Sequence, residues 1–217
     1  MTAQQFLLSG LMLGALGLAA GCASTDMQSS TPAAAPKAAA VPALTCFGVL
    51  PVQVSVAEDQ VLTADEEKHL SAGAAVVDAI LRDVLSANKK ARMLDASQAE
   101  GMQAPDAVVN LETSREVAQS VGCNAILETS LSRYVEREGG PYGVQQPAAV
   151  TLAYRLYDAG TGTVLCHGRF DEQQQSVMEN LFTLGKAGRR GMAWLTAEEL
   201  AREGLMGQLG QCKHLAK

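Results

Sequence analysis

Cysteine is the most reactive residue type in this chain, and the first cysteine, Cys22, lies just after an apolar segment near the N-terminus. It follows an uncharged run from Phe6 to Ala20 that is rich in Leu, Gly and Ala and closes on small residues. An apolar core before a small-residue cleavage site is the pattern of a secretory signal, and the run is short for a transmembrane helix. We therefore expect residues 1–21 to be a signal peptide.

The sequence Leu18-Ala19-Ala20-Gly21-Cys22 resembles the lipobox of bacterial lipoproteins. The resemblance implies that the Cys22 thiol is acylated, with palmitate among its chains, and that the mature chain begins at this cysteine. Several acyl chains, each contributing about 0.8 kcal/mol per buried methylene, make a durable membrane anchor. Because Ala23 is not the Asp associated with inner-membrane retention, the resemblance also implies the periplasmic face of the outer membrane.

Residues 22–43 are expected to form a flexible tether. They are mostly Ala, Ser, Thr and Pro, and such a composition cannot offset the entropy of ordering the chain. Roughly 20 flexible residues have a root-mean-square span of about 25 Å, so the folded part can stand off the membrane. This tail also argues against the alternative that residues 6–20 are a buried first helix. The folded domain is then residues 44–217, enough for one core.

Four further cysteines, an even number in an exported chain, favour disulfides and allow three pairings. They are Cys46, Cys123, Cys166 and Cys212. Four buried free thiols are one alternative. A zinc site built from Cys166-His167 and Cys212-Lys213-His214 is another, although the chain lacks the close Cys-x-x-Cys or His-x-x-x-His spacing of such sites. We expect neither a metal nor a cofactor.

The charge and aromatic content disfavour nucleic acid as a partner. The net charge is −6 and aromatic residues make up 4% of the chain. A phosphate backbone calls for a cationic surface, and base stacking calls for aromatic side chains.

The pattern of apolar residues predicts alternating strands and helices. Residues 47–56 form a Val-rich strand whose alternation shifts phase at Pro51, which indicates a bulge or an edge position. Thr63 and Glu66 form a capping box before a helix of about 22 residues with one apolar face. The cations Lys89, Lys90 and Arg92 follow the end of this helix. We expect them to stabilise the negative end of the helix dipole, with a binding patch as the alternative.

The rest of the chain predicts a further helix, a hairpin and a last helix. The expected elements are a strand over 92–95, a loop over 100–109, a helix over 114–121 that Gly122 ends, strands over 124–132, 150–157 and 163–173, an exposed connection over 133–146, and a helix that starts at the capping box Thr196–Glu199. Turn residues 158–162 make the last two strands an antiparallel hairpin. The fold class is therefore α/β, a single mixed sheet flanked by helices in the order β-α-β-α-β-β-β-α.

Three segments carry a resemblance to a known group of proteins. Phe47–Pro51 (FGVLP), Ala118–Glu128 (AQSVGCNAILE) and Tyr154–Leu165 (YRLYDAGTGTVL) resemble the first strand, the helix-to-strand passage and the hairpin of the TolB amino-terminal-domain and curli-secretion-lipoprotein superfamily. The resemblance implies an envelope scaffold or assembly lipoprotein that works by contact, as similar proteins do in secretion, polysaccharide export and activation of wall synthases.

The topology of that superfamily also implies a disulfide pairing. Its first and third strands are parallel neighbours, and its last helix returns toward the tether end, so all four cysteines fall near one end of the sheet. Cys123 and Cys166 would then lie two strands apart, at about 10 Å, which is beyond the reach of a disulfide. The resemblance therefore implies Cys46 with Cys123 and Cys166 with Cys212.

The chain shows no motif of a known catalytic class, and we expect no enzyme. His69, His167 and His214 lie outside nucleophile-elbow, phosphate-loop and His-Glu-x-x-His patterns. The carboxylates at 65–67 and 198–199 suit the first turns of helices. An enzyme that acts on the cell wall or on polysaccharide remains the alternative.

Two segments offer side chains typical of protein interfaces. The first, Tyr134 to Gln146 with Arg133 before it, carries Arg133, Tyr134, Arg137 and Tyr142; the second, Phe182 to Trp194, carries Lys186, Arg189, Arg190 and Trp194. A solvated hairpin tip and a solvated turn are the plain alternatives. We expect a lipid-anchored periplasmic scaffold or assembly protein that binds an envelope partner or itself, with an accessory part of a secretion or exopolysaccharide export ring as the alternative.

Overall fold

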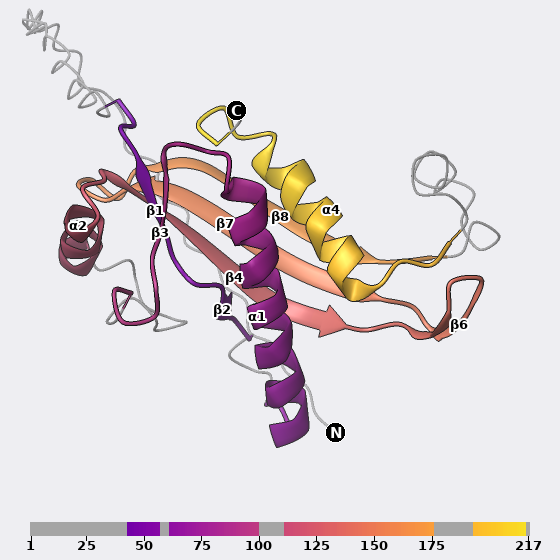
Figure 1. The fold of residues 1–217 in the computed structure, drawn as a ribbon. Helices are drawn as coiled ribbons and strands as arrows, with labels where there is room; N and C mark the ends of the chain where they lie inside the picture. Colours follow the sequence, from indigo (N-terminus) through magenta and orange to yellow (C-terminus); the bar gives the residue numbers. More distant parts are fainter. Residues whose placement is uncertain (1–42, 57–60, 100–110, 176–192, 216–217) are drawn as a thin grey trace, which may run out of the picture. The chain divides into compact units, whose positions relative to one another are not determined.

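The computed structural model describes residues 43–56, 61–99, 111–175 and 193–215 (Figure 1). The elements in chain order are β1 (Phe47–Val49), β2 (Gln53–Val54), α1 (Ala64–Leu85), β3 (Ala91–Met93), α2 (Leu111–Ser120), β4 (Ala125–Val135), β5 (Glu138–Gly140), β6 (Gly143–Gln146), β7 (Ala149–Asp158), β8 (Val164–Gln173) and α4 (Ala197–Leu209).

One mixed sheet carries the fold, with the strand order β3-β1-β4-β7-β8 and with β2 beside β4. The strands β3, β1 and β4 are parallel, as are β2 and β4. The strands β4, β7 and β8 are antiparallel. The predicted α/β class with a mixed sheet is confirmed.

Helices cover the two faces of the sheet unequally. Figure 1 shows α1 and α4 on one face, where they pack on the inward side chains of β4 and β7 and form the main core. Among the described residues, α2 covers one end of the other face, where Val117 and Ala118 pack against Ile126 and Tyr157. We call the part of this face that no described helix covers the open face.

The first strand is interrupted where its alternation shifts phase. The step from Val49 to Gln53 spans four residues, whereas the opposite step from Leu127 to Ser130 spans three. One extra residue on one strand is a bulge, and Pro51, which has no N–H to give to a ladder, lies inside it.

Both predicted capping boxes are present. At α1 the Thr63 hydroxyl accepts from the Glu66 N–H, and the Glu66 carboxylate accepts from the Thr63 N–H at 2.8 Å. At α4 Thr196 and Glu199 make the same exchange. Gly122, with φ +69°, follows α2 in the left-handed conformation expected there.

The segment 133–146 differs from its prediction as an exposed connection. β4 continues to Val135, and β5 and β6 form a separate two-stranded hairpin. Both faces of this hairpin are largely exposed, so the sequence has no alternation of apolar and polar residues to reveal it. The predicted order of elements therefore lacks β2, β5 and β6. The predicted loop at 100–109 lies outside the described residues.

Two disulfides tie the ends of this body to the sheet. Cys46, just before β1, is joined to Cys123, just before β4. Cys166 on β8 is joined to Cys212, just after α4. The pairing is the one that the superfamily resemblance implies, and in this structure it replaces the alternatives of free thiols and a zinc site.

Candidate functional site

A groove of about 830 Å³ lies where α1, the end of β4 and the start of α4 meet. We call it the α1–β4 groove. Residues from α1 form one wall, and the chain from β4 into β5 forms the other. The lining side chains are Leu62, Glu66, His69, Leu70, Ala72, Gly73, Val76, Ser132, Arg133, Tyr134, Val135, Glu136, Arg137, Glu138, Gln146, Thr196 and Glu198.

The ring of Tyr134 lies against the backbone of α1 at Gly73. A Cβ atom added at Gly73 would come within 2.5 Å of the Tyr134 Cγ, so only glycine permits this contact. Burial, followed by the negative charges of Glu136 and Glu198, raises the pKa of Tyr134 to about 12. The phenol is therefore neutral and available as a hydrogen-bond donor throughout the physiological range.

Carboxylates give the groove its charge. Glu66, Glu136, Glu138 and Glu198 line it, against the two cations Arg133 and Arg137. Glu136 also accepts from the Ala197 N–H at 3.1 Å, which places its negative charge at the N-terminus of α4. A segment with basic and apolar side chains matches this lining.

A hairpin arm stands beside the groove and is tied to the segment before α4. The arm is Glu138–Gln146, the strands β5 and β6 with their turn. Its base is held by Arg137, whose Nη1 donates to the Trp194 carbonyl at 2.9 Å. The Trp194 N–H in turn donates to the Pro141 carbonyl at 2.8 Å. At the turn, Tyr142 is 88% exposed, so a large aromatic side chain is offered to solvent on a fixed support.

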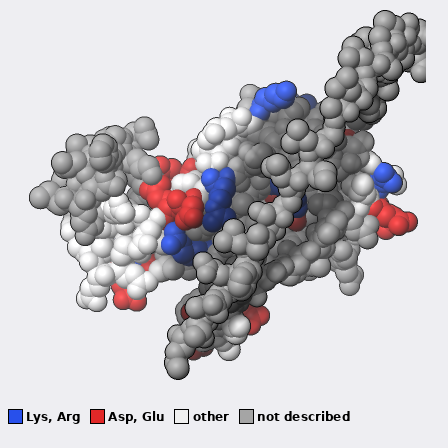
Figure 2. All heavy atoms as spheres, turned by 180° about the vertical axis from the view of Figure 1, so that it is seen from behind, with Lys and Arg blue, Asp and Glu red and all other residues white. Residues whose placement is uncertain are grey.

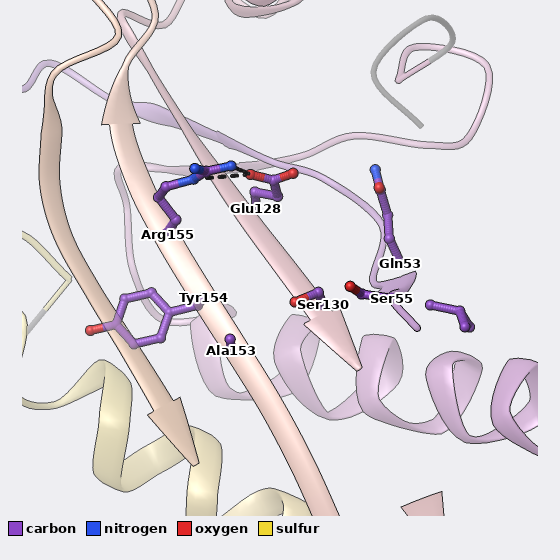
Figure 3. Close-up of a pocket in the computed structure, with 8 residues that line it drawn as sticks. Gln53, Ser55, Glu128, Ser130, Ala153, Tyr154 and Arg155 are labelled. Carbon is purple, nitrogen blue, oxygen red and sulfur yellow. Dashed lines mark hydrogen bonds and ion pairs between the residues drawn. The ribbon is translucent and has the colours of Figure 1, made fainter. Parts of the chain in front are cut away.

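The open face of the sheet carries a second, smaller hollow of about 240 Å³. In Figure 3 Arg155 and Glu128 form one side of it, Gln53 and Ser55 form the other, and Ser130 lies between. The Arg155 Nη2 donates to the Glu128 Oε2 at 2.8 Å. Tyr154 points away from the hollow, toward α4, where its hydroxyl donates to the Gln208 carbonyl.

Ion pairs dominate this open face. Besides Arg155 and Glu128, the Arg133 Nη2 lies 2.8 Å from the Asp171 Oδ1, and the Arg169 Nη2 lies 3.2 Å from the Asp171 Oδ2. Figure 2, seen from behind, shows acidic and basic side chains in contact over the described part of this side. Hydrogen bonds from Thr151 first and from Arg169 second hold the pKa of Asp171 below its usual range, despite some burial.

The structure places four of the predicted interface residues around the groove and the arm. Arg137 donates to the Trp194 carbonyl at the base of the arm, and the Trp194 N–H donates to the Pro141 carbonyl, next to Tyr142 at the turn. Tyr134 lines the groove together with Arg137. Arg133 reaches the rim of the groove but is held by Asp171. Cys22, Lys186, Arg189 and Arg190 lie outside the described residues.

Sequence reasoning missed the residues that shape the groove. Gly73 lies inside a helix, where glycine carries no visible signal of a contact 61 residues away in the chain. Glu136 and Glu198 are seen to act together on Tyr134 only once the segment after β4 is brought to the start of α4. The positive signal for the site was the mixture of aromatic and basic residues at 133–142.

In the described part of the chain, no group of three or more His, Cys, Asp or Glu side chains is arranged to hold a metal ion. Within that same part, none of the helices has the length and apolar character needed to cross a bilayer.

No protein-family model matches the chain, and no curated protein matches it. Among solved structures it is similar to a PelC dodecamer from Paraburkholderia phytofirmans, with 14% identity and a TM-score of 0.44 over 76% of this chain and 84% of that chain. It is also similar to the LpoB C-terminal domain from Escherichia coli, with 22% identity and a TM-score of 0.35 over 61% of this chain and 87% of that chain.

A third similar structure is lipoprotein GNA1162 from Neisseria meningitidis, with 15% identity and a TM-score of 0.36 over 67% of this chain and 95% of that chain. All three TM-scores are below 0.5.

Proposed function

We propose that this chain is a lipid-anchored protein of the bacterial envelope that works by binding another protein through the α1–β4 groove and the hairpin arm. The observation that carries the proposal is the exposed Tyr142 on an arm whose base is hydrogen-bonded to the segment before α4. An exposed aromatic residue on a rigid support makes a large contact with little loss of conformational entropy, as tyrosines at interfaces do.

The lining of the groove indicates what the partner presents. Four carboxylates and the apolar side chains of Leu62, Leu70 and Val76 line one continuous hollow. Arg133 and Arg137 are already engaged, by Asp171 and by the Trp194 carbonyl. The complementary ligand is a segment that carries Lys or Arg beside apolar side chains, because opposite charges steer and orient the contact.

The location rests on the sequence. Acylation at Cys22, a tether over 22–43 and a neutral residue at Ala23 support attachment to the outer membrane, with the domain in the periplasm. There the protein acts as a scaffold or assembly factor and not as an enzyme. Its work is to hold a partner near the membrane within the reach of the tether.

A photo-crosslinking amino acid at Tyr142 tests the proposal in cells. The expected result is a specific adduct with an envelope protein. The same reagent at Gln119, an exposed position on α2, is the matched control and should give no such adduct. Charge reversal by Glu138→Lys together with Glu198→Lys should reduce the Tyr142 adduct at least about tenfold, because it turns attraction for a basic segment into repulsion. Equal labelling from Tyr142 and Gln119, or an adduct indifferent to the reversal, would refute the proposed surface.

A further inference from the structure

We propose that two copies of this chain pair through the outer edges of β8, antiparallel and centred on Phe170, so that their sheets become one continuous sheet. The pairing uses a surface separate from the α1–β4 groove and goes beyond the proposed function. Its occupant is a second copy of the same chain.

β8 lies at the border of the sheet. Among the strands that the structure describes it is the last on its side, next to β7, and it has ten residues. The strand at the opposite end, β3, has only three. Long edge strands are templates for pairing, and proteins usually protect them with Pro, Lys or bulges. The sequence VLCHGRFDEQ contains neither Pro nor Lys. Its register with β7 shifts at Leu165, near the start of the strand, and is regular from Cys166 to Gln173.

Alternate residues of β8 point their backbone groups away from β7. The Gln174 N–H donates to the Ala148 carbonyl at 3.0 Å, so residue 174 points toward β7. In an antiparallel ladder the direction alternates from residue to residue. The N–H and C=O groups that point away from β7 therefore belong to His167, Arg169, Asp171 and Gln173. These four residues form the hydrogen-bonding edge that a new strand would meet.

The charges on β8 select the register of the pairing. Pairing centred on Phe170 places Arg169 of each copy directly opposite Asp171 of the other, and both residues project from the open face. Moving the centre by one residue, to Arg169 or to Asp171, places a like charge opposite itself. Opposite charges across a ladder stabilise it and like charges destabilise it, so the two alternatives are disfavoured. The centre at Phe170 also sets two aromatic rings opposite each other on the covered face.

The helix α4 leaves this edge accessible. Gly204 of α4 lies over the Phe170 ring, since a Cβ at Gly204 would come within 2.5 Å of the Phe170 Cδ1. Arg202 pairs with Asp83 of α1 and so marks the opposite side of α4. At 100° per residue, Gly207 lies on the side of α4 away from α1, where an added Cβ would meet nothing within 4 Å. The helix thus presents a small residue toward the second copy.

The test uses full-length chain extracted in detergent. One preparation carries Arg169→Cys and another carries Asp171→Cys, and the two are mixed under mild oxidation. In the proposed register the two thiols are directly opposite, at a Cα separation of about 5.5 Å, within disulfide reach. The second contact in the mixed pair keeps its native Asp171 and Arg169. The mixture should give a covalent dimer.

Each single variant alone is the matched control. Its two thiols lie on a diagonal at about 7–8 Å, beyond disulfide reach, so it should give little covalent dimer. Arg169→Asp places a carboxylate opposite Asp171 at both symmetry-related contacts of the dimer. Sedimentation should therefore show that it weakens dimerisation at least about tenfold. Arg92→Asp makes the same charge change on β3 and should leave dimerisation unaltered.

Three outcomes would overturn the pairing: no covalent dimer from the mixture, equal yields from the mixture and the single variants, or a chain that stays monomeric at every concentration. A chain that stays monomeric would instead favour an extended strand of another protein as the partner of β8. None of them bears on the Tyr142 adduct, so failure of the pairing and failure of the proposed function are distinguishable.

Discussion

The contact between Gly73 and Tyr134 shows how one residue without a side chain forms a wall of the groove. Replacing Gly73 by Ala puts a methyl group 2.5 Å from the Tyr134 Cγ, so the ring must move or α1 must shift. Overpacking of this kind costs about 1–3 kcal/mol, which exceeds the roughly 1 kcal/mol that Ala gains over Gly in a helix. We expect Gly73→Ala to lower the free energy of unfolding, as measured by urea denaturation.

Gly207→Ala is the matched control for that substitution. Gly207 also lies inside a helix, but a Cβ there meets nothing within 4 Å. It should raise the free energy of unfolding by about 0.5–1 kcal/mol through helix propensity alone. Equal effects of the two substitutions would show that Tyr134 does not rest on α1.

The raised pKa of Tyr134 makes stability depend on pH in the alkaline range. Its pKa is about 12 in the folded chain, against an ordinary value of 10. The unfolded chain therefore ionises first, and the stability contributed by the neutral phenol is complete below pH 10 and is lost as the pH rises through 12. We expect Tyr134→Phe to lose less stability than the native chain between pH 9 and about 11.5, as followed by urea midpoints. A parallel fall in the two proteins would contradict the burial of this hydroxyl.

At the scale of elements, the sequence predicts a feature when the residues that cause it lie within a few positions of one another. Thr63 and Thr196 each satisfy an amide three residues ahead, so both helix starts are visible in the sequence. The bulge at Pro51 is likewise encoded by a residue that cannot donate to a ladder. The hairpin β5–β6 was missed because both of its faces meet solvent, and periodicity records only burial.

The candidate site was less predictable because it is assembled from distant elements. Tyr134 and Arg137 could be named from residue type, but their partners Gly73 and Trp194 are 61 and 57 residues away. A single sequence gives no measure of such separations. Only the strand order and the place of α4 against β7 and β8 bring these residues together.

The two disulfides connect elements that are distant in the sequence. Cys46–Cys123 closes a sequence separation of 77 residues and Cys166–Cys212 one of 46. Closing loops of this length typically contributes about 2–5 kcal/mol each, because it restricts the unfolded chain. We expect the double variant Cys166→Ala/Cys212→Ala to have a lower urea midpoint than the native chain. Dithiothreitol should lower the midpoint of this variant less than it lowers the midpoint of the native chain. A midpoint unchanged by reductant in both would argue against the bonds.

At the scale of the whole molecule, the groove with its arm and the β8 edge are different surfaces, and the charged face connects them: Arg133 at the groove rim pairs with Asp171, which lies on β8 with Arg169. The groove and the arm lie where β4 ends and α4 begins. The charged face lies on the side of the sheet away from α1 and α4, and β8 forms one border of the sheet. A partner in the groove and a second copy at β8 can therefore be held at once. Such a division suits a scaffold, which must join molecules without consuming them.

The anchor decides where those surfaces act. Cys22→Ser removes the thiol that acylation requires, so we expect unprocessed chain, no incorporation of labelled palmitate and loss of the membrane fraction. Ala23→Ser, next to it, is the control and should leave all three readouts unchanged. Ala23→Asp should keep the label but move the protein to the inner-membrane fraction, as the lipoprotein resemblance implies. Labelling and fractionation of Cys22→Ser that match the native chain would remove the basis for an envelope role, since the groove would then have no fixed place beside a partner.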